Sequence, residues 1–182
     1  MRRSESLIVA FFVCVSALMT HRLQAQWSAS PVIALGPSIP TGAMGSSVSY
    51  GGVIKAGLWM RAPKVPVGLT VEGLYTQFGI NASRTGTGDS RIGALTANVT
   101  TRRHQRRLEL YGVVGGGWYW HDGPIDPFPA RQAAGINVGV GEVIALGARD
   151  YFAELRLHAI RTPARTGEGW MSFMPLVLGV RF

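Results

Sequence analysis

Residues 170–182 read Trp-Met-Ser-Phe-Met-Pro-Leu-Val-Leu-Gly-Val-Arg-Phe, and their pattern is the clearest indication of the fold. Toward the carboxyl end, large apolar side chains recur at every second position, while the only charge, Arg181, falls on the other phase. Such an alternation is typical of a β-strand whose two faces meet different surroundings. The stretch is also long enough to cross a bilayer, because a tilted transmembrane strand needs only about 9–11 residues.

Seven other segments show a similar alternation, at 28–37, 49–60, 66–78, 91–102, 107–120, 133–146 and 150–160. The connections between the eight segments alternate in length. The long ones are 38–48, 79–90, 121–132 and 161–169, and the short ones are 61–65, 103–106 and 147–149. This pattern predicts an all-β protein, an eight-stranded antiparallel up-and-down transmembrane β-barrel with turns at one end and loops at the other.

The charged residues within the strands avoid the apolar faces. The inward-facing set is Lys55, Glu72, Glu109, Glu154, Arg156 and Arg181. A lysine or arginine on the lipid face costs roughly 2–4 kcal/mol at the bilayer midplane, so the apolar faces are predicted to meet lipid and the charges to line the lumen. A soluble barrel of the lipocalin kind is the structural alternative, and it would need the reverse sidedness.

Glu142 is the one charge that falls on an apolar face. The glycines Gly139 and Gly141 just before it allow a β-bulge, which would turn the Glu142 side chain inward. The alternative is that Glu142 stays outside but lies near the interfacial turn, where a charge costs little. Of the two, the sequence favours the bulge, with the Glu142 side chain pointing inward.

The six lumen charges balance, three basic against three acidic. If the turn at 61–65 is symmetric, Lys55 lies directly opposite Glu72. Glu154 and Arg181 both lie near the turn end of adjacent strands and are candidates for a second pair. The interior of an eight-stranded barrel is just wide enough for side chains to fill, so we interpret these residues as a packed, ion-paired lumen. A gated ion path is the functional alternative.

Residues 1–25 have the three parts of a secretory signal peptide. A basic start with Arg2 and Arg3 precedes the apolar core Leu7–Met19, and Ala25 offers a small residue for cleavage. Cleavage after Ala17 and retention as an amino-terminal anchor are the alternatives, but the core is shorter than the roughly 20 residues of a spanning helix. The barrel domain is then 26–182, exported to the bacterial outer membrane.

Composition excludes other classes of protein. Hydrophobic residues make up 47% of the chain and charged residues only 15%, against about 25% in typical proteins, which excludes a disordered chain. The net charge is +8, and the largest basic group is Arg102, Arg103, Arg106 and Arg107 in a short turn. These arginines either contact lipid phosphates or are simply solvated. Nucleic acid is not an expected partner, because the turn of an exported barrel meets none.

Three stretches resemble bacterial outer-membrane β-barrel domain proteins, in particular the small eight-stranded OmpA/OmpX-like barrels. They are Pro175–Phe182, Phe152–His158 and Glu72–Tyr75. The resemblance implies a monomer in contact with outer-membrane lipid and lipopolysaccharide. It also implies insertion by the barrel-assembly machinery, which recognises a terminal phenylalanine; the matching residues here are Phe182, Val180, Leu178 and Leu176.

The sequence predicts no catalytic, cofactor-binding or metal-binding residues. Lipid A deacylases are eight-stranded barrels with a histidine and a serine two residues apart on the lipid-facing side. Here His158 is followed by Ala159 and Ile160, and its phase points inward. We therefore predict a non-enzymatic, porin-like outer-membrane protein for membrane integrity or for surface contact through loops such as 121–132. The alternatives are a small transport conduit for ions or small hydrophobic molecules and, third, a lipid-modifying enzyme.

Overall fold

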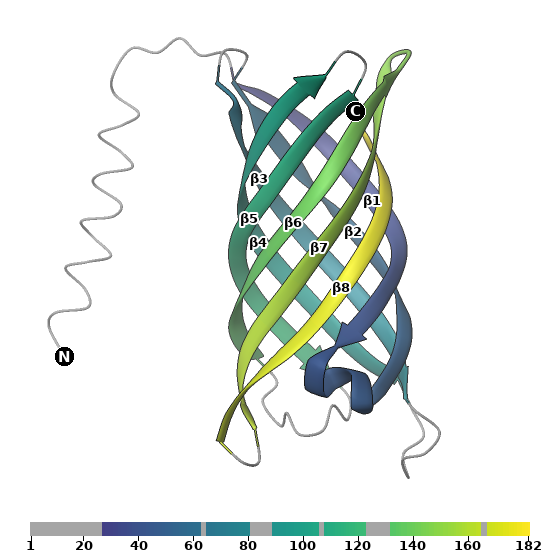
Figure 1. The fold of residues 1–182 in the computed structure, drawn as a ribbon, viewed down its shortest axis with the longest axis vertical. Helices are drawn as coiled ribbons and strands as arrows, with labels where there is room; N and C mark the ends of the chain where they lie inside the picture. The colour runs from purple at the N-terminus through teal and green to yellow at the C-terminus, as the bar shows by residue number, and fades with distance from the viewer. Residues whose placement is uncertain (1–26, 63–64, 81–88, 106–107, 123–131, 165–166) are drawn as a thin grey trace, which may run out of the picture.

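The computed structural model describes residues 27–62, 65–80, 89–105, 108–122, 132–164 and 167–182. They form one closed antiparallel barrel in which each strand pairs with the next and the last pairs with the first (Figure 1). The strands are β1 (Ser28–Thr41), β2 (Val48–Arg61), β3 (Val67–Ile80), β4 (Asp89–Gln105), β5 (Leu108–Asp122), β6 (Gln132–Leu146), β7 (Arg149–Ala164) and β8 (Gly167–Arg181). The predicted fold class is confirmed. The signal-peptide prediction lies outside the described residues.

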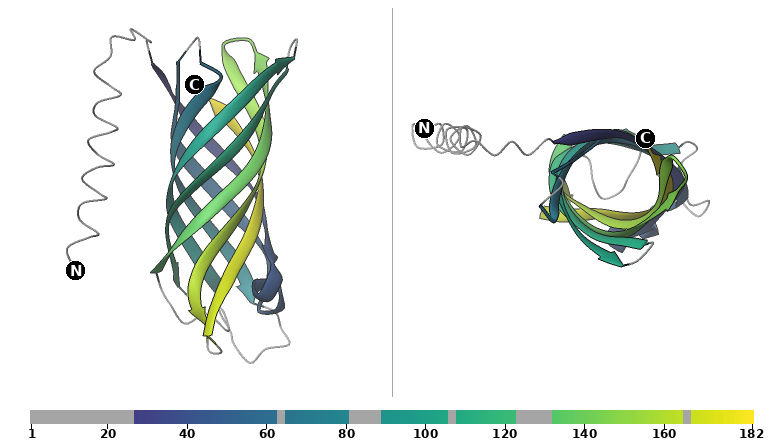
Figure 2. Two further views of the ribbon diagram at one scale, coloured as in Figure 1. Left: turned by 60° about the vertical axis from the view of Figure 1, so that its left-hand side comes forward. Right: turned by 90° about the horizontal axis from the view of Figure 1, so that it is seen from above.

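The strands are strongly staggered around the barrel (Figures 1 and 2). Following the residues that lie opposite one another once around the ring, from Pro31 in β1 through β2 to β8, leads back to β1 at Thr41, ten residues further along. Such a stagger accompanies the tilt that a closed barrel requires. Each observed strand is longer than the predicted one and runs for 14 to 17 residues.

Two predicted long connections are wrong in extent. The segment 161–169 is mostly paired strand, because Arg161 lies opposite Trp170 and the pairing continues to Ala164 and Gly167. The segment 38–48 holds the end of β1 and a short 3-10 helix, η1 (Gly42–Ser46). Beyond Ile160 and before Ser172, β7 and β8 pair only with each other, and β1 after Ser38 pairs only with β8. This continued pairing satisfies backbone groups that a loop would leave to solvent. The prolines that indicated loops at these positions are accommodated within the strands.

The outer wall of the barrel is mostly apolar on all eight strands. On β6, for example, Ile136, Val138 and Val140 are 60%, 55% and 65% exposed, while the intervening Asn137 is buried. The same alternation runs through the other strands, which confirms the predicted outward and inward faces, except that Arg91 and Arg103 of β4 are also exposed on the outer face. The described residues contain no helical segment that could span a bilayer.

The predicted bulge at Glu142 is wrong. β6 pairs with β5 and with β7 in continuous register, so that Glu142 lies opposite Leu110 on one side and Ala153 on the other. Because the register never shifts, Glu142 keeps the outward phase of Val140 and Ile144. Glu142 lies four residues before β6 ends at Leu146, so the alternative position near the turn is the one observed.

Candidate functional site in the barrel lumen

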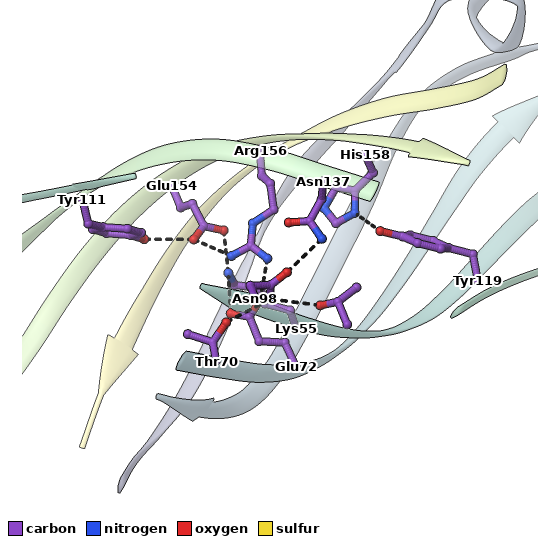
Figure 3. A network of polar contacts seen from close by, with 11 residues as sticks. Lys55, Thr70, Glu72, Asn98, Tyr111, Tyr119, Asn137, Glu154, Arg156 and His158 are labelled. Atoms are coloured by element: carbon purple, nitrogen blue, oxygen red, sulfur yellow. Dashed lines mark hydrogen bonds and ion pairs between the residues drawn. The ribbon is translucent and has the colours of Figure 1, made fainter. Parts of the chain in front are cut away.

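Four charged side chains form a compact cluster at the centre of the lumen (Figure 3). Lys55 projects from β2, Glu72 from β3, and Glu154 and Arg156 from β7. The Lys55 Nζ atom lies 3.1 Å from Glu72 Oε1 and 2.6 Å from Glu154 Oε1. Arg156 donates from Nη1 to Glu72 Oε2 at 2.6 Å and from Nη2 to Glu154 Oε2 at 2.7 Å. Each carboxylate therefore contacts both cations, and the cluster is neutral.

Lys55 and Glu72 make an ion pair, but they are not directly opposite as predicted. Lys55 lies opposite Leu74, and Glu72 lies opposite Gly57. The two charges meet along a diagonal, which long side chains on neighbouring strands can span. Gly57 makes room for this, because a Cβ atom there would lie only 2.9 Å from Glu72 Cγ. The register differs from the expected one by two residues, a shift that preserves the face of each side chain but changes its partner.

Neutral side chains complete the hydrogen bonding of the carboxylates. Asn98 donates from Nδ2 to Glu72 Oε2 at 3.1 Å and to Thr70 Oγ1 at 2.9 Å. Asn137 donates to Asn98 Oδ1 at 2.9 Å, and Tyr111 donates to Glu154 Oε2 at 3.0 Å. Sequence reasoning missed these residues. Their positions in the alternation could have identified them, since each lies on the inward face of its strand together with buried neighbours.

The remaining lumen charges gather at the turn end, around Arg181. Arg181 lies opposite Asp150 in the β7–β8 ladder, and its Nε donates to Asp150 Oδ2 at 3.0 Å. Its Nη1 lies 3.8 Å from Glu109 Oε1, which also lies 3.6 Å from Arg61 Nη1. The expected pairing of Arg181 with Glu154 is wrong, because Glu154 lies opposite Val177 and contacts the central cluster instead.

Aromatic side chains lie between the two charged groups. The ring of Trp59 contacts Tyr111 edge-on with centroids 4.9 Å apart, and Phe152 at 6.3 Å. The Arg181 guanidinium lies over Trp59, 4.9 Å from the ring centroid, and Lys55 Nζ lies 5.5 Å from that of Phe152. This layer separates the central cluster from the turn-end cluster, so the lumen charges form two local groups.

Toward the loop end, the lumen is closed by a largely apolar layer. His158 is stacked on Phe173, with centroids 4.9 Å apart and planes inclined by 5°, and its Nδ1 lies 2.8 Å from the Tyr119 hydroxyl. Phe78 packs edge-on against Phe173 at 5.9 Å. His158 is only 1% exposed and faces away from the outer wall, as its phase predicted. Its geometry is that of a packed, hydrogen-bonded core side chain.

The central cluster leaves almost no free space. The cavity beside it, lined by Lys55, Arg156 and His158 among others, has a volume of about 10 Å³. That is room for about one water molecule. Burying ions is costly, and the reciprocal pairing offsets much of that cost only while all four charges are present. Among the described residues, no group of three histidine, cysteine, aspartate or glutamate side chains is arranged to hold a metal ion.

The predicted assembly-signal residues lie together on the outer wall of β8 and at the end of the chain. Leu176, Leu178 and Phe182 are exposed and share one face with Val180. The Phe182 N–H donates to the Pro31 carbonyl at 3.0 Å, which ties the carboxyl terminus to β1. Recognition of these residues by an assembly machinery stays a prediction.

No protein-family model and no curated protein matches the chain. Among solved structures, neisserial surface protein A (NspA) matches with a TM-score of 0.64 and 16% identity, covering 85% of this chain and 97% of NspA. Two structures of Ail, the attachment invasion locus protein of Yersinia pestis, match with TM-scores of 0.47 and 0.45 at 14% and 16% identity. They cover 85% of this chain and 99% and 97% of Ail. The likeness to NspA supports the eight-stranded barrel fold.

Proposed function

We propose that this protein is a non-enzymatic integral barrel of the bacterial outer membrane with a closed lumen. It serves membrane integrity or surface contact through its loop end. The observation that carries the proposal is the sidedness of the wall, which is mostly apolar on the outside and ion-paired on the inside. Soluble monomers rarely expose contiguous apolar patches larger than a few hundred Å². An exposed apolar band around a whole barrel is typical of a protein surrounded by lipid.

Aromatic side chains on the outer wall support the same placement. Trp118, Trp120 and Trp170 are about half exposed near the loop end, and Tyr151 and Phe182 are exposed near the turn end. Tryptophan and tyrosine concentrate at the two levels where hydrocarbon meets water, because their rings combine an apolar body with a polar group. In a lipocalin-like barrel the interior would be apolar, whereas here it contains two charged clusters.

The packed lumen favours a structural role over a transport conduit. A conduit needs a continuous path, but the central cavity has room for about one water molecule and an apolar layer lies beyond it. A lipid-modifying activity has still less support, because His158 is buried in the lumen and contacts Tyr119 and Phe173. Surface contact is assigned to the loop end, whose connections 81–88 and 123–131 lie outside the described residues.

Heat-dependent migration on SDS gels tests the membrane barrel and its assembly. In outer-membrane fractions from cells expressing the full chain, we expect unheated protein to migrate faster than heated protein, because the folded barrel is far more compact than the unfolded chain. Deleting Phe182 is expected to lower the yield of the fast form. The control is a Phe182→Tyr variant, which keeps the aromatic end and its backbone hydrogen bond. Soluble protein with no heat shift would contradict the proposal.

Planar-bilayer recordings test whether the lumen conducts. We expect the full chain to give near-zero conductance, because the lumen is filled by side chains. The Lys55→Ala, Glu72→Ala double variant is expected to remain closed, since the apolar layer around Phe78 and Phe173 is intact. Discrete openings in the unmodified protein that change in size in the double variant would instead support an ion path through the central cluster.

A further inference from the structure

A groove lies on the outer wall near the turn end, crossing β5 between β4 and β6. Its volume is about 380 Å³. Gly112 lies between Thr101 of β4 and Val140 of β6, its partners on either side, and all three line the groove with Leu110. Because Gly112 has no side chain, the wall is hollowed there between two larger neighbours.

Two opposite charges flank this groove in a single row across the sheet. Arg103 of β4 lies opposite Leu110 of β5, and Leu110 lies opposite Glu142 of β6. With neighbouring strands about 4.8 Å apart, the Cα atoms of the two charged residues are separated by roughly 10 Å. Both side chains share the outward phase of Leu110.

Neither Arg103 nor Glu142 has a partner in the part of the chain that the structure describes. The ion pairs and hydrogen bonds of the described residues include neither side chain. The adjacent Arg102 differs, because its Nη2 donates to the carbonyls of Ala62 and Val65, at 3.3 Å each. An unpaired cation and an unpaired anion therefore remain on an apolar wall, on either side of an apolar groove.

We infer that this groove binds a zwitterionic glycerophospholipid with a primary-amine headgroup, that is, a phosphatidylethanolamine. Its phosphate is bound by Arg103, its ammonium by Glu142, and one acyl chain lies over Gly112 and Val140. A guanidinium suits phosphate because its parallel N–H groups match the phosphate oxygens. A primary ammonium donates hydrogen bonds to a carboxylate, which a quaternary amine cannot do. The inference rests on the proposed function, because it needs the outer wall to face lipid.

The headgroup is what accounts for both charges at once. A carboxylate attracts an ammonium group and repels a second negative charge, so Glu142 disfavours an anionic lipid and favours one with an amine. Arg103 alone would accept any phosphate. Arg103 and Glu142 together select a headgroup that carries both charges, and the groove provides the apolar contact for the acyl chain.

Native mass spectrometry of the full chain in detergent, titrated separately with phosphatidylethanolamine, phosphatidylglycerol and phosphatidylcholine, tests the inference. We expect the unmodified protein to bind phosphatidylethanolamine most tightly. Arg103→Gln is expected to weaken binding of all three lipids about tenfold, since a charge-assisted phosphate contact is lost. Glu142→Gln is expected to abolish the preference for phosphatidylethanolamine over phosphatidylglycerol. Gly112→Leu, which fills the groove, is expected to remove binding of all three.

Arg91→Gln is the matched control, because Arg91 is exposed toward the opposite, loop end of β4. It should bind the three lipids as the unmodified protein does. Equal affinity of the unmodified protein for all three lipids, or variants at Arg103 and Glu142 that bind like the control, would overturn the inference. The same samples are run unheated on SDS gels. A heat shift without lipid preference refutes only the lipid site, whereas loss of the heat shift in the unmodified protein refutes the membrane barrel itself.

Discussion

Replacing Arg156 with methionine is expected to lower the free energy of unfolding by about 3–5 kcal/mol. Arg156 donates to both Glu72 and Glu154 in the centre of the lumen, and its side chain is 3% exposed. Without it, two buried carboxylates share the single cation Lys55, and one negative charge is left uncompensated in a space with room for about one water molecule. Urea titration of the barrel in lipid vesicles, followed by the folded fraction on unheated gels, measures the loss.

Two controls distinguish the energetic cost of an unpaired buried charge from the cost of lost packing. Replacing the whole cluster, Lys55, Glu72, Glu154 and Arg156, with apolar residues of similar volume is expected to cost far less than the single substitution, because no charge is left unpaired. Arg91→Met, at an exposed site, is expected to change stability by less than about 0.5 kcal/mol. If Arg156→Met costs no more than Arg91→Met, the centre of the lumen is hydrated, and the conduit alternative gains support.

Replacing Val138 with arginine is expected to destabilise the barrel by about 2–4 kcal/mol. Val138 lies on the outer wall in the middle of β6, between Val114 of β5 and Leu157 of β7, and is 55% exposed. An arginine there would place its guanidinium in hydrocarbon if the wall faces lipid. The same urea titration in vesicles measures the cost, together with the yield of folded protein in the outer-membrane fraction.

The position of the charge along the strand provides the control. Leu146→Arg, at the turn end of the same strand, is expected to cost only about 0–1 kcal/mol, because a charge near the interface reaches water. Val138→Leu tests the size of the side chain without its charge and should be close to neutral. If Val138→Arg changes stability by less than about 0.5 kcal/mol, the wall faces water, as in a soluble barrel.

The eight strands and their faces were predictable because both are local properties. Whether a side chain such as Leu155 or Glu154 points outward or inward depends only on its place in an alternation of period two. Each strand pairs with the next one along the chain, so the order of the strands also follows from the sequence. The errors in the strands fell at their ends, as at 161–169, where pairing between β7 and β8 overrode the proline and glycines that indicate a loop.

The composition of the central cluster was only partly predictable. Lys55 and Glu72 were expected together from their inward phase and the turn between them, although the direct register was wrong by two residues. Asn98, Asn137 and Tyr111 were missed, because a neutral side chain on an inward face looks the same in sequence whether it packs or donates a hydrogen bond. Glu154 was assigned to Arg181 because the two lie on adjacent strands, but its ion-pair partners come from β2 and from its own strand.

The position of a residue in the alternation is therefore enough to assign its side chain to the outer wall or to the lumen, since that position is set residue by residue along each strand. Which lumen residues meet depends instead on the tertiary structure. Partners depend on the register of every pair of strands and on the ten-residue stagger that accumulates around the ring, and closure brings Lys55 of β2 against Glu154 of β7. A two-residue slip leaves every face unchanged while it exchanges every partner, so no pattern along one strand specifies the contacts across the barrel.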